Sequence, residues 1–256
     1  MKVPLYDAFS QDYDRFVDWA GRLEFEMPFF RALFRQHGVR RMLDVACGTG
    51  QHAIAFAREG LTVAAADLSQ AMVERARANV AAAGVEVTVR RAGFGQLAET
   101  FRHPFDAITC LGNSLPHLTS EAELVSGLGD MAALLVPGGV LVIQNRNMDR
   151  VLMRGERFMP PQVHREGDEE WIFFRFYDMD GAQLDFNVLR LHRPPKGTWQ
   201  IEYEQTSLRA WQSSELIQAL RNVGLEILGQ YGSYRGEPFD RAESGDWIGV
   251  ARRPPP

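Results

Sequence analysis

The run from Arg41 to Gly50 constrains the fold of this chain more than any other stretch. It reads Arg-Met-Leu-Asp-Val-Ala-Cys-Gly-Thr-Gly. The residues Met42 to Ala46 predict a short buried strand, the glycines predict a tight turn, and a helix is expected to begin at about Gln51. Glycine lets a ligand approach the main chain, and the start of a helix presents unpaired N–H groups. The stretch therefore predicts a small-ligand site between a strand and a helix.

One candidate ligand for this turn is a dinucleotide. The segment from Gly48 to Ala53 fits the pattern G-x-G-x-x-A, and Asp67 follows at about the spacing of a ribose-binding acid. Asp44 argues against this interpretation because it places a charge in an otherwise apolar strand, where an unpaired charge is costly. A bound ammonium group accounts for that charge, whereas a phosphate does not.

The full run Leu-Asp-Val-Ala-Cys-Gly-Thr-Gly resembles motif I of the class I S-adenosylmethionine (SAM)-dependent methyltransferases. SAM carries an amino-acid end, a sulfonium and an adenosine, has no pyrophosphate, and leaves S-adenosylhomocysteine as product. The resemblance implies that Asp67 accepts hydrogen bonds from the two ribose hydroxyls. It implies further cofactor contacts at Asp44, Ala46, Cys47, Gly48, Gly50, Leu68, Met72, Phe94 and Leu111. Leu68 and Met72 are also open to interpretation as core. Gly93 stands where the family often carries a polar residue that reads the adenine.

Length and composition suit one α/β domain with a modest insertion. Hydrophobic residues make up 45% and charged residues 24% of the 256 residues, as in ordinary globular proteins. The net charge of -5 disfavours nucleic acid as a partner. Two cysteines are too few for a disulfide framework. Since no apolar run approaches membrane-spanning length and the first residues do not begin a signal peptide, we expect a cytoplasmic protein with no membrane partner. The oligomeric state stays open.

Strand and helix patterns alternate after the first strand. This alternation predicts a Rossmann-like, seven-stranded, mostly parallel sheet with helices on both faces, and the order resembles the methyltransferase sheet, whose last strand is antiparallel. Three alternating segments (171–177, 184–191 and 199–208), separated by turn signals, predict a small antiparallel β insertion after strand five. The expected organisation is an N-terminal helical lid (1–37), a SAM-binding α/β core (38–149), the antiparallel β insertion as a substrate cover (150–212) and the C-terminal part of the core (213–256).

The N-terminal segment is amphipathic and rich in aromatic residues. Tyr6-Asp7-Ala8-Phe9 is echoed seven residues later by Tyr13-Asp14-Arg15-Phe16. Pro28 is expected to start a new helix that ends at Gly38. The segment is open to two interpretations, a plain cover for the sheet or a lid over the cofactor with Tyr13 near the reacting centre.

Two further motifs concern the methyl acceptor. Leu-Gly-Asn-Ser-x-x-His-Leu after strand four and Asn145-Arg146-Asn147-Met148-Asp149 after strand five together resemble the glycine and glycine/sarcosine N-methyltransferases. The resemblance implies that Asn113 and Arg146 hold an amino-acid substrate, with Arg146 pairing bidentately with its carboxylate. His117 matches as well, although a loop histidine is more often structural. The alternative for Arg146 is a salt bridge to an acid such as Asp149.

The motifs together predict transfer of a methyl group from SAM to the amine nitrogen of a small, carboxylate-bearing molecule, with Tyr13 and Asn113 near the reacting atoms. No residue stands out as a dedicated base. Because Asn113 occupies the edge where a magnesium-dependent enzyme needs acids, no metal is expected. The aromatic insertion is richer than glycine requires, so a larger amine is at least as plausible. Alternatives are an O- or C-methyltransferase of a natural-product intermediate, a non-catalytic SAM-binding protein, and an NAD(P)-dependent oxidoreductase, which the lack of a Tyr-x-x-x-Lys pair disfavours.

Overall fold

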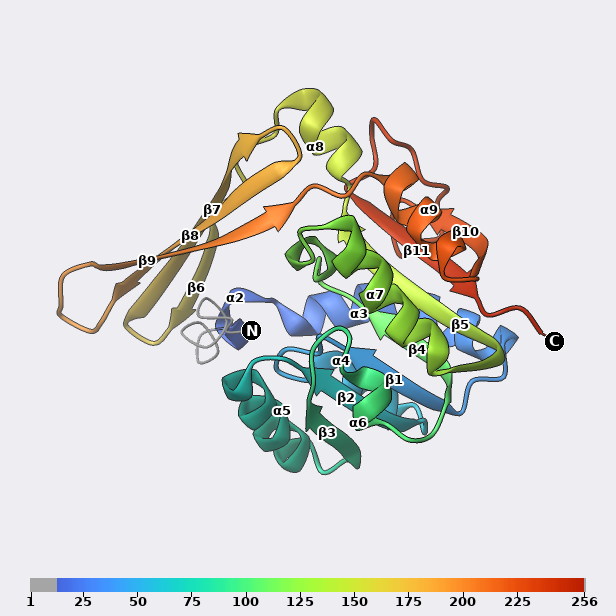
Figure 1. Cartoon of the computed structure of the whole chain (residues 1–256). Coiled ribbons are helices and arrows are strands. Elements are labelled where there is room, and N and C mark those ends of the chain that lie inside the picture. Colours follow the sequence, from blue (N-terminus) through green and yellow to red (C-terminus); the bar gives the residue numbers. More distant parts are fainter. Residues whose placement is uncertain (1–12, 256) are drawn as a thin grey trace.

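The computed structural model describes residues 13–255, and the strands within that range form two sheets (Figure 1). Sheet A has seven strands in the order β10-β11-β5-β4-β1-β2-β3, and sheet B has four in the order β6-β7-β8-β9. The strands are β1 (Arg41–Val45), β2 (Thr62–Asp67), β3 (Val87–Arg91), β4 (Phe105–Cys110), β5 (Leu135–Arg146), β6 (Gln162–Glu166), β7 (Glu169–Asp180), β8 (Gln183–Arg193), β9 (Gln200–Arg209), β10 (Glu226–Tyr231) and β11 (Asp246–Arg252).

Sheet A has the predicted mostly parallel arrangement. Strands β1 to β5 pair in parallel, and β11 runs antiparallel to both β5 and β10. The helices are α2 (Tyr13–Phe16), α3 (Trp19–Gln36), α4 (Gln51–Arg58), α5 (Gln70–Ala83), α6 (Leu97–Thr100), α7 (Glu121–Ala133), α8 (Met148–Arg154) and α9 (Ser213–Asn222), with a short 3₁₀ turn η1 (Leu115–His117). One apolar cluster lies between the sheet and α6, α7 and α9, and another lies between the sheet and α3, α4 and α5. The predicted fold class is therefore confirmed.

The local signals at the helix ends act as expected. The side chain of Ser69 accepts a hydrogen bond from the Met72 amide and caps α5, which ends at Gly84 in the left-handed conformation. Ser120 and Glu123 form a capping box at the start of α7. These short-range interactions fix where each helix begins relative to the strand before it.

Two details of the sequence prediction are wrong. Pro28 lies inside the continuous helix α3 and does not start a new one. The insertion has four strands where three were expected, because β6 pairs with β7 ahead of the predicted hairpins. Its residues, Gln-Val-His-Arg-Glu, are mostly exposed and lack a clear apolar face.

Sheet B leaves the end of β5 through α8 and stands beyond the carboxyl edge of sheet A (Figure 1). Helix α2 connects the two regions. Arg15 forms an ion pair with Glu166 of β6 (3.3 Å) and lies over the Trp171 ring (4.6 Å), and Phe16 packs edge-on against Phe173 (5.4 Å between centroids). Within residues 13–255, no helix has both the length and the apolar character needed to cross a bilayer.

Candidate active site

The turn after β1 adopts the conformation that its glycines permit. Ala46, Gly48 and Gly50 have φ of 55°, 55° and 81°. Gly50 is the N-cap of α4 and provides no side-chain cap, so the first N–H groups of α4 are not bonded by a cap residue. A Cβ at Gly50 would lie 3.1 Å from Cβ of Ala76 in α5. The turn therefore needs glycine for its backbone angles and for the close approach of α5.

Asp67 lies at the carboxyl end of β2, beside this turn. Its Oδ2 accepts a hydrogen bond from the Gly48 amide (2.8 Å) and its Oδ1 accepts one from the Ser69 amide (2.9 Å). The side chain is only partly buried. Its position at the carboxyl end of β2, with both oxygens of one carboxylate beside the motif I turn, fits a pair of ribose hydroxyls.

Asp44 provides a test of whether the site suits the amino-acid end of SAM. The residue is 2% exposed, and Thr109 Oγ1 donates to its Oδ1 at 2.8 Å. Its Oδ2 is buried and has no hydrogen-bond partner in the described part of the chain. Burial raises the pKa of this carboxyl to about 6. An unsatisfied acidic oxygen near the motif I turn is what a ligand with an ammonium group complements, so the residues present fit the cofactor.

The raised pKa of Asp44 gives a pH prediction for the ligand-free protein. A folded-state pKa of about 6 against the usual 3.8 stabilises the fold while the carboxyl is protonated, and this contribution is lost as the pH rises through 6. We expect the free energy of unfolding to fall by about 3 kcal/mol from this group between acidic and neutral pH. Urea unfolding across this range, compared with Asp44→Asn, measures the difference. Parallel curves for the two proteins would contradict it.

The other expected cofactor residues divide by exposure. Cys47, Met72 and Leu111 are 8%, 1% and 5% exposed, which places them largely in the packed interior. Leu68 remains partly accessible. A Cβ at Gly93 would lie 3.0 Å from Leu68 Cδ1, so the missing side chain at position 93 makes room for Leu68.

Phe94 and Ala46 complete the expected cofactor set. Phe94 packs against α7, because a Cβ added at Gly127 would lie 3.2 Å from the Cβ of Phe94. Phe94 also packs against the apolar cluster between sheet A and α6, α7 and α9. Both Phe94 and Ala46 remain partly accessible. Phe94 is thus held by α7 near the end of β3.

The described part of the expected lid covers the motif I turn. A Cβ at Gly48 would lie 3.6 Å from Cε1 of Tyr13, so the tyrosine ring stands directly over the turn. Asp14 fixes it there: its Oδ1 accepts from Thr49 Oγ1 (2.5 Å) and Trp19 Nε1 (3.0 Å), and its Oδ2 accepts from Asn79 Nδ2 (3.0 Å). The remainder of the expected lid, residues 1–12, lies outside the described residues.

Loss of the Asp14 anchor should separate cofactor affinity from fold stability. We expect Asp14→Ala to weaken S-adenosylhomocysteine binding roughly tenfold, because side-chain hydrogen bonds of this kind contribute about 1 kcal/mol each. The melting temperature should change little, since the anchor is peripheral to both apolar clusters. Calorimetry together with thermal unfolding measures both effects. An unchanged dissociation constant would mean that the segment has no part in binding the cofactor.

A cavity of about 510 Å³ adjoins the turn on the far side of Tyr13. We call it the acceptor cavity; its lining includes Tyr13, Phe16, Asn113, His117, Arg146 and Arg175. It lies between the N-terminal helices, the ends of β4 and β5, and the inward face of β7 and β8. The structure therefore brings Tyr13, Asn113, His117 and Arg146 together at one cavity.

Asn113 has a structural role in addition to lining this cavity. Its φ is 65°, and its Oδ1 accepts from the Arg146 amide at 3.0 Å. Its own amide donates to the Gln144 carbonyl at 3.2 Å. The side chain thus joins the ends of β4 and β5, and its Nδ2 has no partner in the described part of the chain. That amide group is left as a donor at the cavity.

Arg146 lies at the end of β5. Its Nη2 is 3.6 Å from Glu156 Oε2, and its Cζ is 5.6 Å from the centroid of the Tyr177 ring. Asp149 is paired with Arg241 at 2.7 Å, so the acid that forms a salt bridge with Arg146 is Glu156 and not the Asp149 named as an example. This ion pair is long and involves one Nη of Arg146, which leaves the guanidinium able to bind an anion in the cavity as well.

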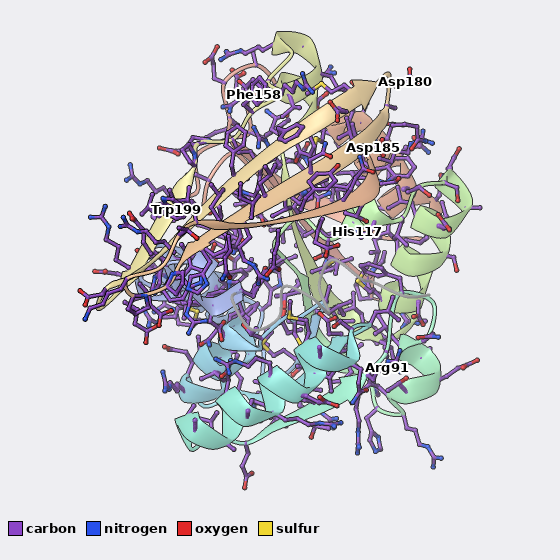
Figure 2. The ribbon with its side chains drawn as sticks, turned by 90° about the vertical axis from the view of Figure 1, so that its left-hand side faces the viewer. Arg91, His117, Phe158, Asp180, Asp185 and Trp199 are labelled. Atoms are coloured by element: carbon purple, nitrogen blue, oxygen red, sulfur yellow. The ribbon has the colours of Figure 1, made fainter. Side chains whose placement is uncertain are left out.

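His117 lies between sheet B above and the α/β layers below, whereas Arg91 lies far from the insertion (Figure 2). Burial lowers the pKa of His117 to about 4. The imidazole is therefore neutral at neutral pH and adds no positive charge to the acceptor cavity.

The chain matches a known family model and several characterised proteins. Residues 42–139 match the family model described as a methyltransferase domain. The glycine/sarcosine N-methyltransferase of Parasynechococcus marenigrum (strain WH8102) is 39% identical over 149 residues, which are 58% of this chain and 53% of that protein. The chain thus spans about half the length of the curated relatives it matches.

Two solved structures share the fold over nearly the whole chain. A SAM-dependent methyltransferase from Clostridium acetobutylicum superposes with a TM-score of 0.80 at 17% identity and covers 98% of this chain and 99% of its own. A SAM-bound amino pentose methyltransferase from Micromonospora echinaspora, involved in calicheamicin biosynthesis, gives a TM-score of 0.72 at 22% identity, covering 99% and 98%. At these identities the likeness shows the fold alone, and it includes the insertion.

Proposed function

We propose that this chain, which matches a methyltransferase domain over residues 42–139 and shares the fold of a SAM-dependent methyltransferase, transfers a methyl group from SAM to the amine nitrogen of a small molecule that carries a carboxylate. The observation that carries the proposal is the position of Arg146. Its guanidinium borders the acceptor cavity, and its ion pair with Glu156 is long, at 3.6 Å. The similarity to a glycine/sarcosine N-methyltransferase supports an amine as the acceptor.

When bound, the cofactor would supply an electrophilic methyl group on its sulfonium: the amine nitrogen would bond to the methyl carbon as the carbon–sulfur bond breaks in line, and S-adenosylhomocysteine would be the leaving group. The chain's own residues have the task of binding and orienting the two partners. Asp67 and Asp44 hold the ribose and ammonium ends, and Tyr13 closes the turn against water. Arg146 holds the carboxylate of the acceptor, and Asn113 Nδ2 donates to it.

The amine must arrive deprotonated, and we assign no dedicated base. His117 is neutral at neutral pH because burial lowers its pKa to about 4. Its position at the cavity wall suits shape and hydrogen bonding to the acceptor. We therefore do not expect the replacement of His117 to abolish the reaction.

Methyl transfer from labelled SAM to matched acceptors tests the function. Each amino acid is paired with its carboxamide (glycine with glycinamide, for example), and an amino sugar is included because one structural neighbour is an amino pentose methyltransferase. We expect label on nitrogen, found by mass spectrometry, and at least about tenfold higher kcat/KM for the acid than for the amide. Label on oxygen or carbon, or equal rates within pairs, would overturn the proposal. Cofactor binding without any transfer would favour a SAM-binding module.

A further inference from the structure

Arg175 interrupts an aromatic row on the inward face of β7. The alternate residues Trp171, Phe173 and Tyr177 are 5%, 0% and 1% exposed, and Arg175 stands among them. It lines the acceptor cavity together with Arg146. A charged side chain in such a row needs a compensating partner.

The structure gives Arg175 little compensation. Its Nη2 donates to Gln162 Oε1 at 3.2 Å, and its Cζ lies 4.5 Å from the centroid of the Phe16 ring. Its Nε is buried without a hydrogen-bond partner, and no carboxylate lies within salt-bridge distance of it anywhere in residues 13–255. Burial lowers the pKa of Arg175 to about 10, and the nearby charge of Arg146 acts in the same direction. The group is still a cation at neutral pH.

Other arginines of sheet B and its approach are neutralised. Arg157 pairs with Asp178, Arg165 and Arg193 pair with Glu170, and Arg190 pairs with Glu202. Arg190 gives the closest comparison, because it lies opposite Phe173 on the same face of the sheet as Arg175 and has its acid on β9, whereas Arg175 faces the cavity without one.

The other charges of the cavity do not balance it. Arg22 is paired with Glu26 at 2.7 Å, and Arg150 shares Glu156 with Arg146 at 3.0 Å. Asp246 also lines the cavity, and burial raises the pKa of its carboxyl. In the described part of the chain, the ionisable groups that act on Arg175 are Tyr177, Arg146 and Tyr13, with no carboxylate among them, so the charge of Arg175 is left for an anion in the cavity.

We infer that Arg175 binds a second anionic group of the acceptor, so that the substrate is an amine with two acidic ends, of the class of the dicarboxylic amino acids. The inference rests on the proposed function, in which Arg146 takes the first carboxylate. It also accounts for a cavity of about 510 Å³, which lies in the range of sites for molecules well above the size of glycine.

Kinetics with paired acceptors tests this role. Aspartate and glutamate are compared with asparagine and glutamine, which differ only in the second acid. We expect wild type to prefer the diacids by roughly 10- to 100-fold in kcat/KM. Arg175→Gln should remove that preference while retaining the rate with the amides, and Arg175→Lys should restore part of it. Arg165→Gln, on β6 and outside the cavity, is the matched control and should behave as wild type.

A binding measurement separates this inference from the proposed function. Glutarate has two carboxylates and no amine, so its affinity for the S-adenosylhomocysteine-loaded protein, measured against glutaramate, does not depend on turnover. We expect tighter binding of glutarate in wild type and none of this difference in Arg175→Gln. If the protein binds glutarate more tightly than glutaramate but methylates no amine, the proposed function alone is contradicted. Equal binding of glutarate and glutaramate by the wild-type protein would overturn the inference. So would an equal loss of kcat/KM with all acceptors in Arg175→Gln at an unchanged melting temperature. Either result would leave Arg175 as a partner for Phe16.

Discussion

Asp67→Ala should weaken S-adenosylhomocysteine binding by more than about 100-fold, because hydrogen bonds to a charged group contribute about 1.5–3 kcal/mol each and two ribose hydroxyls lose their acceptor. The same substitution releases the Gly48 and Ser69 amides, which loosens the turn that carries the ligand. Isothermal titration calorimetry at one protein concentration measures the loss directly.

Asp106→Ala is the matched control for this result. The Asp106 Oδ2 accepts from the amides of Arg40 and Arg41 at 2.9 and 2.8 Å, so it too is a carboxylate that ties backbone amides together. It lies at the start of β4, on the opposite edge of sheet A. Its loss should reduce stability with little change in cofactor affinity. Near-native affinity in Asp67→Ala would reject the ribose assignment.

Arg146→Ala should raise the KM of a carboxylate-bearing acceptor at least about 100-fold, because removal of a bidentate guanidinium from a partly buried carboxylate costs about 3 kcal/mol. Cofactor affinity should be unchanged, since Arg146 borders the acceptor cavity and not the motif I turn. Steady-state kinetics and calorimetry on the same preparation measure the two quantities.

Arg146→Lys separates charge from geometry. A lysine keeps the positive charge but lacks the planar fork of the guanidinium, so it should recover only part of the lost affinity. The backbone amide of residue 146 still donates to Asn113 in both variants, which keeps the end of β5 in place. An unaltered KM in Arg146→Ala would move the carboxylate site elsewhere.

Much of the fold could be predicted because its signals are local. The glycine turn after β1, the Ser69 cap and the alternation of strands and helices each depend on residues close in sequence. The contacts of Asp67 with Gly48 and Ser69 follow from the spacing between two adjacent parallel strands. Those parts of the candidate cofactor site were therefore accessible from sequence.

The parts that were missed depend on tertiary contacts. Pro28 lies within α3, whose buried face includes Met27 and Phe30, and this packing outweighs the usual tendency of proline to end a helix. Asp14 is one more acid in the sequence, and only the fold brings Thr49 and Asn79 to it. Arg175 did leave a trace, since it breaks the apolar alternation of Trp171, Phe173 and Tyr177, but its lack of an acidic partner is visible only in three dimensions.

Helix α2 contacts both the motif I turn, through Asp14, and sheet B beside the acceptor cavity, through Phe16. Because one short helix joins the two sites, binding at one site can change the affinity of the other, and such thermodynamic coupling is reciprocal. We therefore expect a bound cofactor to tighten the binding of the acceptor, and a bound acceptor to tighten the binding of the cofactor by the same factor.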